Sequence, residues 1–263
     1  MIIGNKEFDI KNNTYIMGIL NVTPDSFSDG GKWNNLDKAL KRAEEMIEQG
    51  ADIIDIGGES TRPGHIAVTE EEENNRVLKV IENVKNKFDI PVSIDTYKSG
   101  TALRAINCGA DMINDIWGFK FDPNMAGIVA SQQKVCCLVH NASGTIQDVK
   151  EDLIQSINIA LYNGISADKI ITDPGIGFGK TYNQNVKIIN ELDKLQDLGY
   201  PVLLGASRKS VIQIALNLSA MECIEGTLVT TVMAVMKGCS FIRVHDVKEN
   251  KRAVQMAERI LNG

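Results

Sequence analysis

Short apolar runs and longer amphipathic stretches alternate along almost the whole chain. The apolar runs predict strands at residues 15–20, 52–57, 91–95, 111–115, 135–140, 169–173, 201–206 and 240–245. Between them, apolar residues recur at i, i+3 and i+4, which is the period of an amphipathic helix. Residues 36–50, 69–87 and 185–199 show this helical period most plainly. The pattern therefore predicts eight strand–helix units.

Several expected strands are apolar on both faces, as parallel strands covered by helices are. Eight such units favour an α/β fold, a TIM (β/α)8 barrel. The competing architecture is a doubly wound open sheet, which usually carries a GxGxxG turn after its first strand. Here the first strand runs into NVTPDSFSDGG instead. We expect a single domain over residues 1–263, with a short N-terminal hairpin or plug before the first long strand.

Composition narrows the class of protein. The 263 residues are 43% hydrophobic and 24% charged, which is ordinary for a soluble globular protein. The net charge of −6 speaks against nucleic acid or an anionic membrane as a partner. No apolar run approaches the ~20 residues of a membrane helix, and the N-terminus lacks a signal-peptide core. The five cysteines form no CxxC motif, so we interpret them as reduced thiols of a cytoplasmic protein.

Polar residues recur where the predicted strands end, which is where a TIM barrel builds its active site. A single aspartate there could simply cap a helix, but a set that converges on one mouth indicates a site. Four of these residues suit a planar, nitrogen-rich heterocycle: Asp95, Asn114, Asp173 and Lys209. A carboxylate accepts paired N–H donors, as it does from a guanidinium, and a lysine donates to a ring carbonyl.

A second set is cationic and predicts an anion site. Arg62, Arg243 and His245 belong to it, with Asn21 nearby. Phosphate is the default anion, because barrel loops after the last two strands often bind one. Asn21 is too weak to hold a metal alone, but it could complete a Mg²⁺ shell of phosphate oxygens and waters.

The stretch TDPGIGFGKT at residues 172–181 raises the possibility of a phosphate-binding P-loop. That motif needs a glycine five residues before the final Gly-Lys pair. Pro174 stands there instead, and Asp173 would repel a triphosphate. We therefore do not expect a P-loop nucleotidase, and interpret Lys180 as a lysine at a helix start.

Seven ordered motifs resemble the dihydropteroate synthase family. They are ILNVTPDSFSDGG, GADIIDIGGESTRPG, SIDT, GADMINDIWG, DPGIGFGKT, GASRKS and RVHDV, and they span nearly the whole chain. The resemblance implies a TIM-barrel transferase of folate biosynthesis, a homodimer that uses Mg²⁺. Such an enzyme condenses (7,8-dihydropterin-6-yl)methyl diphosphate with 4-aminobenzoate and releases diphosphate. We expect an SN1-like transfer, since no protein nucleophile is apparent.

The resemblance also implies roles for individual residues. Asp95, Asn114, Asp173 and Lys209 would hold the pterin, and Asp95, Asp173 and Lys209 would act in catalysis. Thr61, Arg243 and His245 would contact the diphosphate. Arg62, Pro63 and Ser210 would border 4-aminobenzoate, and Asn21 would bind Mg²⁺.

Some features leave alternatives open. Val139 stands where the family usually has a methionine, and the loop after His140 looks shortened. Asp55 could support the site or cap a helix, and His140 could contact a ligand or be structural. A methyltetrahydrofolate-dependent methyltransferase of the pterin-binding family is the main alternative, but it would not need STRPG, SRKS and RVHDV. A non-catalytic pterin-binding protein is another.

Overall fold

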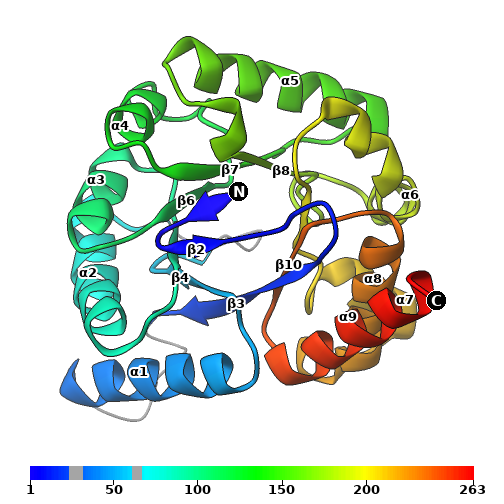
Figure 1. The fold of residues 1–263 in the computed structure, drawn as a ribbon, viewed down its shortest axis with the longest axis horizontal. Helices are drawn as coiled ribbons and strands as arrows, with labels where there is room; N and C mark the ends of the chain where they lie inside the picture. Colours follow the sequence, from blue (N-terminus) through cyan, green and yellow to red (C-terminus); the bar gives the residue numbers. More distant parts are fainter. Residues whose placement is uncertain (24–31, 61–66) are drawn as a thin grey trace.

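Eight parallel strands form a barrel with the helices packed around it (Figure 1). The computed structural model describes residues 1–23, 32–60 and 67–263, without the side chains of residues 32–35. The strands are β3 (Tyr15–Asn21), β4 (Ile53–Gly57), β5 (Val92–Asp95), β6 (Met112–Asp115), β7 (Val135–Val139), β8 (Ile170–Asp173), β9 (Leu203–Leu204) and β10 (Phe241–Val244). Their order is β8-β7-β6-β5-β4-β3-β10-β9, and a parallel bridge from Thr172 to Val202 closes the ring. The predicted barrel is confirmed.

The helices cover the outside of the barrel. In the described residues they are α1 (Lys32–Glu48), α2 (Glu70–Lys87), α3 (Ser99–Asn107), α4 (Met125–Ser131), α5 (Ile146–Tyr162), α6 (Tyr182–Asn190), α7 (Ser210–Leu216), α8 (Ile224–Met236) and α9 (Val247–Leu261). The helix predicted at 185–199 is wrong in part. It divides into α6 and a 3₁₀ segment, η3 (Leu192–Leu198), which ends at Gly199 in the left-handed conformation. None of the described helices is both long and apolar enough to span a membrane.

The barrel interior changes from apolar to polar along each strand. Side chains two residues apart on a strand share one face, so inward positions come in pairs. Ile53 precedes Asp55 and Met112 precedes Asn114 in this way. Further pairs are Ile171 with Asp173 and Phe241 with Arg243. The four apolar members belong to one buried cluster, so their polar partners are raised towards the C-terminal mouth.

A short N-terminal hairpin covers the other end of the barrel, as the sequence predicts. Its strands are β1 (Ile2–Ile3) and β2 (Lys6–Glu7), which pair antiparallel. Ile3 and Phe8 pack into the apolar interior cluster, and the Phe8 ring meets that of Tyr15 edge-on with centroids 4.8 Å apart. In Figure 1 the hairpin lies across the barrel opening. The C-terminal mouth is left for the polar residues.

Candidate active site

Arg243 lies between two buried carboxylates at the centre of the C-terminal mouth. Its Nε is 2.6 Å from Oδ2 of Asp55, and its Nη2 is 2.6 Å from Oδ2 of Asp95. Asp55 is completely buried and Asp95 nearly so. Ion pairs with this geometry fix the plane of the guanidinium. The sequence groups Arg243 with an expected anion site, and the structure shows that it also pairs with carboxylates, one of them from the heterocycle set.

Around this arginine lie acceptor oxygens for which the described part of the chain provides no donor. Asn114 donates to Asp55 over 3.4 Å. The Oδ1 atoms of Asp55, Asp95 and Asn114 are buried and have no hydrogen-bond partner among the described residues. A buried acceptor left unpaired costs free energy that a donor recovers. The arrangement is therefore suited to a ligand that presents N–H groups.

Asp173 adds another carboxylate at the end of β8. Its Oδ1 accepts a hydrogen bond from the backbone N–H of Gly175 at 2.7 Å. A Cβ placed on Gly205 would lie 3.6 Å from Oδ2, so the absence of a side chain there leaves room beside this oxygen. Lys209 donates to the carbonyl of Ile176, and its Nζ lies 4.4 Å from the centre of the Phe178 ring.

The turn after Asp173 needs its glycines. Gly175 and Gly177 have φ of +66° and +85°, which favour glycine. A Cβ on Gly175 would lie 1.8 Å from the carbonyl oxygen of His140, and one on Gly177 would lie 3.0 Å from Cδ of Lys209. The turn brings β7, β8 and Lys209 together.

Lys180 stabilises this turn through hydrogen bonds to its backbone. Its Nζ donates to the carbonyl oxygens of Gly175 at 2.9 Å, Phe178 at 3.1 Å and His140 at 3.3 Å. Thr181, the next residue, caps α6 by accepting from Gln184 N. The ammonium thus serves the backbone of the turn, which is a structural role that the sequence did not indicate.

Burial moves the pKa values of the central groups towards neutrality. Desolvation raises the pKa of Asp95 to about 7, with Arg243 opposing the shift and Asp55 adding to it. Desolvation likewise raises the pKa of Asp173, against the charge of Lys209. The pKa of Lys209 falls to about 8 through desolvation, against the charge of Asp173. Each charged form is therefore stabilised incompletely by the protein, and a complementary ligand would stabilise it further.

His245 is oriented by a serine. Its Nδ1 lies 3.0 Å from Oγ of Ser207, which also accepts from the backbone N–H of His245 at 3.2 Å. Arg208, which follows Ser207, pairs with Asp246 through Nε at 3.1 Å and Nη2 at 2.5 Å. These contacts tie the loop after β9 to the end of β10.

The other predicted residues lie at the mouth or outside the described part. Asn21 ends β3, and a Cβ on Gly57 would lie 3.7 Å from its Oδ1 and 3.9 Å from Oδ2 of Asp95. Ser210 is exposed at the first position of α7. Thr61, Arg62 and Pro63 lie outside the described residues. His140 is buried, and burial together with the Lys180 charge lowers its pKa to about 4.

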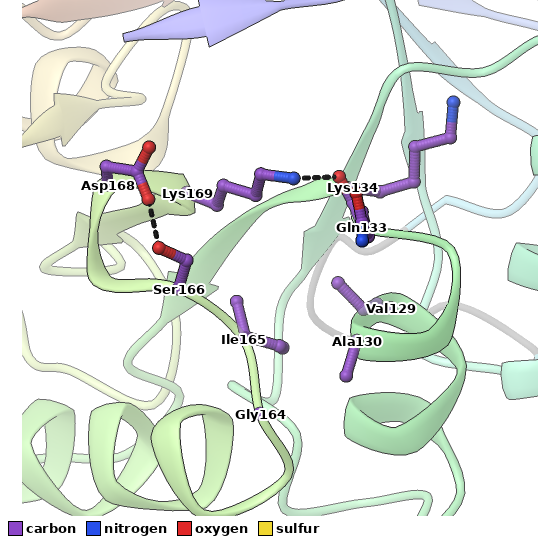
Figure 2. Close-up of a pocket in the computed structure, with 9 residues that line it drawn as sticks. All are labelled: Val129, Ala130, Gln133, Lys134, Gly164, Ile165, Ser166, Asp168 and Lys169. Atoms are coloured by element: carbon purple, nitrogen blue, oxygen red, sulfur yellow. Dashed lines mark hydrogen bonds between the residues drawn. The ribbon is translucent and has the colours of Figure 1, made fainter.

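A cavity of about 290 Å³ lies away from this group, where β7 and β8 begin (Figure 2). Its lining includes Gln133, Lys134 and Lys169, and Lys169 Nζ donates to the Gln133 carbonyl at 2.6 Å. None of the predicted site residues that the structure describes lines it. The convergent polar groups at the C-terminal mouth, rather than this cavity, mark the site.

Known proteins resemble this chain both in sequence and in fold. The family model described as pterin binding enzyme matches residues 17–245. A dihydropteroate synthase of Clostridium beijerinckii is 57% identical over 267 residues, 99% of each chain. That of Bacillus subtilis is 49% identical and covers 96% of this chain and 90% of its own.

Solved structures agree. Clostridium difficile dihydropteroate synthase, determined in the presence of pteroic acid, has a TM-score of 0.95 at 48% identity, covering 98% of this chain and 100% of its own. The Xanthomonas albilineans enzyme with 4-aminobenzoic acid has a TM-score of 0.92 at 36% identity, covering 96% and 94%. The similarity therefore extends over nearly the full length of each chain.

Proposed function

Because the chain belongs to the pterin-binding enzymes, and within them to the dihydropteroate synthases, we propose that it uses the residues at its barrel mouth to make 7,8-dihydropteroate. The substrates are (7,8-dihydropterin-6-yl)methyl diphosphate and 4-aminobenzoate, and diphosphate leaves. The relatives support this transferase and not the methyltransferase that the sequence left open. One observation carries the assignment of the site, namely the buried acceptor oxygens around Arg243 that have no donor among the described residues.

Pterin recognition is assigned to the acceptors and Lys209. Asp173 keeps Oδ2 available for the amino-amidine edge, since Gly175 binds Oδ1. Asp95 and Asn114 would accept from or donate to the remaining ring nitrogens. Lys209 would donate to the ring carbonyl. The depth of these groups in the barrel excludes water, which strengthens each hydrogen bond.

The diphosphate is assigned to the rim of the mouth. His245, oriented by Ser207, would donate to it. Arg243 commits Nε and Nη2 to carboxylates, so its other terminal nitrogen is the donor that remains. Thr61, which lies outside the described residues, is proposed as a third contact on the basis of the motif match.

Mg²⁺ fits the donor chemistry at this rim. Asn21 offers a hard carboxamide oxygen, and Mg²⁺ commonly takes one or two protein ligands together with waters and substrate phosphates. In the described residues, no three His, Cys, Asp or Glu side chains gather as a metal cage. When bound, Mg²⁺ would supply positive charge that stabilises the departing diphosphate.

The charges of the buried cluster favour an SN1-like transfer. Three carboxylates, Asp55, Asp95 and Asp173, face two cations, Arg243 and Lys209. When all are ionised, the cluster carries one net negative charge. That charge would stabilise the positive charge left on the pterin methylene as diphosphate departs. The amine of 4-aminobenzoate then attacks this carbon, so no protein nucleophile is required. Arg62, Pro63 and Ser210 are proposed to border the aminobenzoate.

A homodimer is proposed through the face formed by α7, α8 and α9. Large apolar side chains are exposed there, among them Ile214, Val229, Met236, Met256 and Ile260. These helices lie side by side in Figure 1. Large apolar side chains exposed together on neighbouring helices are typical of protein–protein contacts. A cytoplasmic location is also proposed, because the five cysteines are free thiols and reducing compartments preserve such thiols.

The test is diphosphate release from the dihydropterin substrate, with and without 4-aminobenzoate and Mg²⁺. We expect aminobenzoate-dependent turnover by the wild type and at least a ~100-fold loss in Asp173→Ala, the size of effect expected for a transition-state contact. Slow release of diphosphate without 4-aminobenzoate would support the SN1-like order. Pteroic acid binding without turnover would overturn the synthase activity.

A further inference from the structure

We propose that Asp55 is a positioning residue for this reaction, one that holds Arg243 and Asn114 in place from beneath the pterin site. The proposal rests on the proposed function, because it assigns Asp55 a part in that same site. It differs from the substrate contacts assigned above, since Asp55 acts through its two neighbours. The side chains of Arg243 and Asn114 both donate to the same atom, Oδ2 of Asp55.

Strand register places Asp55 one inward position below the pterin contacts. Gly57, two residues further along β4, pairs with Asp95, and Asp95 pairs with Asn114. Asp55 itself pairs with Ser93 and Ile19 on the neighbouring strands. It is completely buried, whereas Asp95 and Asn114 retain some exposure. A ligand that enters from the mouth therefore meets the level of Asp95 and Asn114 first.

The two carboxylates hold Arg243 at different points. Asp55 binds Nε, close to the aliphatic stem, and Asp95 binds the terminal Nη2, each at 2.6 Å. Together they fix the rotation of the guanidinium, which a single contact would leave free. Without Asp55, Arg243 would bind Asp95 alone and compete with the pterin for its oxygens.

Asn114 is held by the same oxygen. Its Nδ2 lies 3.4 Å from Oδ2 of Asp55. This contact directs the amide nitrogen downwards into the barrel, so that Oδ1, which has no partner among the described residues, is left to the ligand. Asp55 thus sets the orientation of two side chains at once.

Stability alone gives little reason for a carboxylate at this depth. A buried ion pair seldom exceeds the stability of well-packed apolar residues of the same volume. Asp55 also repels Asp95, since its charge contributes to the raised pKa of that group. Asp55 therefore adds little to the free energy of unfolding. Its position is accounted for by the reaction, in which it orients Arg243 and Asn114.

A double-mutant cycle tests the proposal. Turnover of the two substrates is measured for the wild type, Asp55→Asn, Arg243→Met and the double variant. Asp55→Asn should lower kcat/KM at least about tenfold in the wild type but less than about twofold in Arg243→Met, because residues that act through one another are not additive. Equal losses in the two backgrounds would overturn the proposal.

Asp115 offers a matched control. It is a second fully buried aspartate at a strand end, and its oxygens accept from the backbone of Trp117 at 2.8 Å and Phe119 at 3.0 Å. Asp115→Asn should therefore have the same effect with and without Arg243. The coupling to Arg243→Met could be as strong for Asp115→Asn as for Asp55→Asn. That result would show that the cycle detects only loss of packing, and it would overturn the proposal.

The pH profile separates positioning from a structural role. Asp55→Asn removes a negative charge beside Asp95, so the acid limb of kcat/KM should move to lower pH. An unchanged limb would count against the proposal. If Asp55→Asn does not fold, kcat/KM of the double variant is compared with that of Arg243→Met alone. A value more than about tenfold lower in the double variant would overturn the proposal.

Pteroic acid affinity, measured by calorimetry on the same variants, keeps the proposal separate from the synthase assignment. If the wild type shows no turnover, the synthase assignment is contradicted. The double-mutant cycle, measured on pteroic acid affinity, would still decide the role of Asp55. Coupled losses of affinity would support it, and additive losses would overturn it.

Discussion

The Nη2 of Arg243 lies 2.6 Å from Oδ2 of Asp95, yet Asp95 still binds its proton more tightly than an ordinary carboxyl. Burial outweighs the attraction of the arginine and, with the nearby charge of Asp55, brings the pKa of Asp95 to about 7. The protein alone therefore stabilises the ionised form of Asp95 incompletely. Donors from a bound ligand would lower this pKa, which links pterin binding to the ionisation of Asp95.

This linkage gives a prediction for stability against pH. Between pH 3.8 and about 7, folded Asp95 keeps a proton that the unfolded chain releases. Its contribution to the free energy of unfolding is complete below the lower value and is lost as pH rises through the upper one. Asp95→Asn cannot ionise, so relative to wild type it should gain at least about 1 kcal/mol between pH 5 and pH 8.

Urea unfolding of the two proteins at both pH values is the measurement. The comparison is a difference between pH values, so any change in packing that does not depend on pH cancels, while the strengthening of the Arg243 contact on ionisation is already part of the pKa of Asp95. The same relative stability at pH 5 and pH 8 would show that Asp95 does not titrate in this range.

The Gly175 turn predicts a sharp contrast between two glycines with similar backbone. Gly175 and Gly199 have φ of +66° and +75°. A Cβ on Gly175 would lie 1.8 Å from the His140 carbonyl oxygen, whereas one on Gly199 would meet nothing within 4 Å. Gly199→Ala should therefore cost only the left-handed backbone, about 1 kcal/mol. Gly175→Ala should cost more and should also displace Asp173.

Thermal unfolding and pteroic acid binding measure these two effects. Gly199→Ala should keep wild-type affinity, because its turn at the end of η3 lies outside the site. Gly175→Ala should lose affinity at least about tenfold, the loss of one charge-assisted contact. Matching results for the two variants would argue that the turn does not position Asp173.

The Ser207–His245 contact predicts an effect on one substrate only. Ser207→Ala removes the oxygen 3.0 Å from Nδ1 of His245, and with it one of the contacts that orient the ring. Because His245 is proposed to contact the diphosphate, kcat/KM for the dihydropterin diphosphate should fall about five- to twentyfold, as for loss of one orienting hydrogen bond. Pteroic acid carries no diphosphate, so its affinity should stay at the wild-type level.

Steady-state kinetics and calorimetry on the same preparation check this prediction. Ser131→Ala is the control, since Ser131 is exposed at the end of α4 and its Oγ donates only to the Ile128 carbonyl. A parallel loss of pteroic acid affinity in Ser207→Ala would place His245 at the pterin instead.

The proposed dimer face predicts a change of mass. Val229 on α8 is 59% exposed, and Val229→Glu would place a charge in a buried apolar interface. We expect this variant to sediment as a monomer where the wild type sediments as a dimer. Tyr162→Glu is the control, because Tyr162 is 92% exposed at the end of α5, and α5 lies apart from α8 in Figure 1. A wild type that sediments as a monomer would exclude the dimer.

The sequence determined the strands, their alternation with helices and the level at which the polar residues lie. Apolar runs and helical periods depend on neighbours within one element, so β3 to β8 and β10 were expected within a residue or two at each end. The strand expected at 201–206 is reduced to Leu203–Leu204. Its neighbours Thr172 and Phe241 come from elements on either side, which no local pattern specifies.

Only the tertiary structure decided how the polar residues combine. Asp55 and Arg243 are 188 positions apart in the sequence, and closure of the barrel brings them to 2.6 Å. That contact joins Arg243, which the sequence grouped with an anion site, to the carboxylates, and the role proposed for Asp55 rests on it. A strand end shows which side chain faces the mouth, but its partner is set by the register and closure of the whole barrel, because those alone fix distances between remote strands.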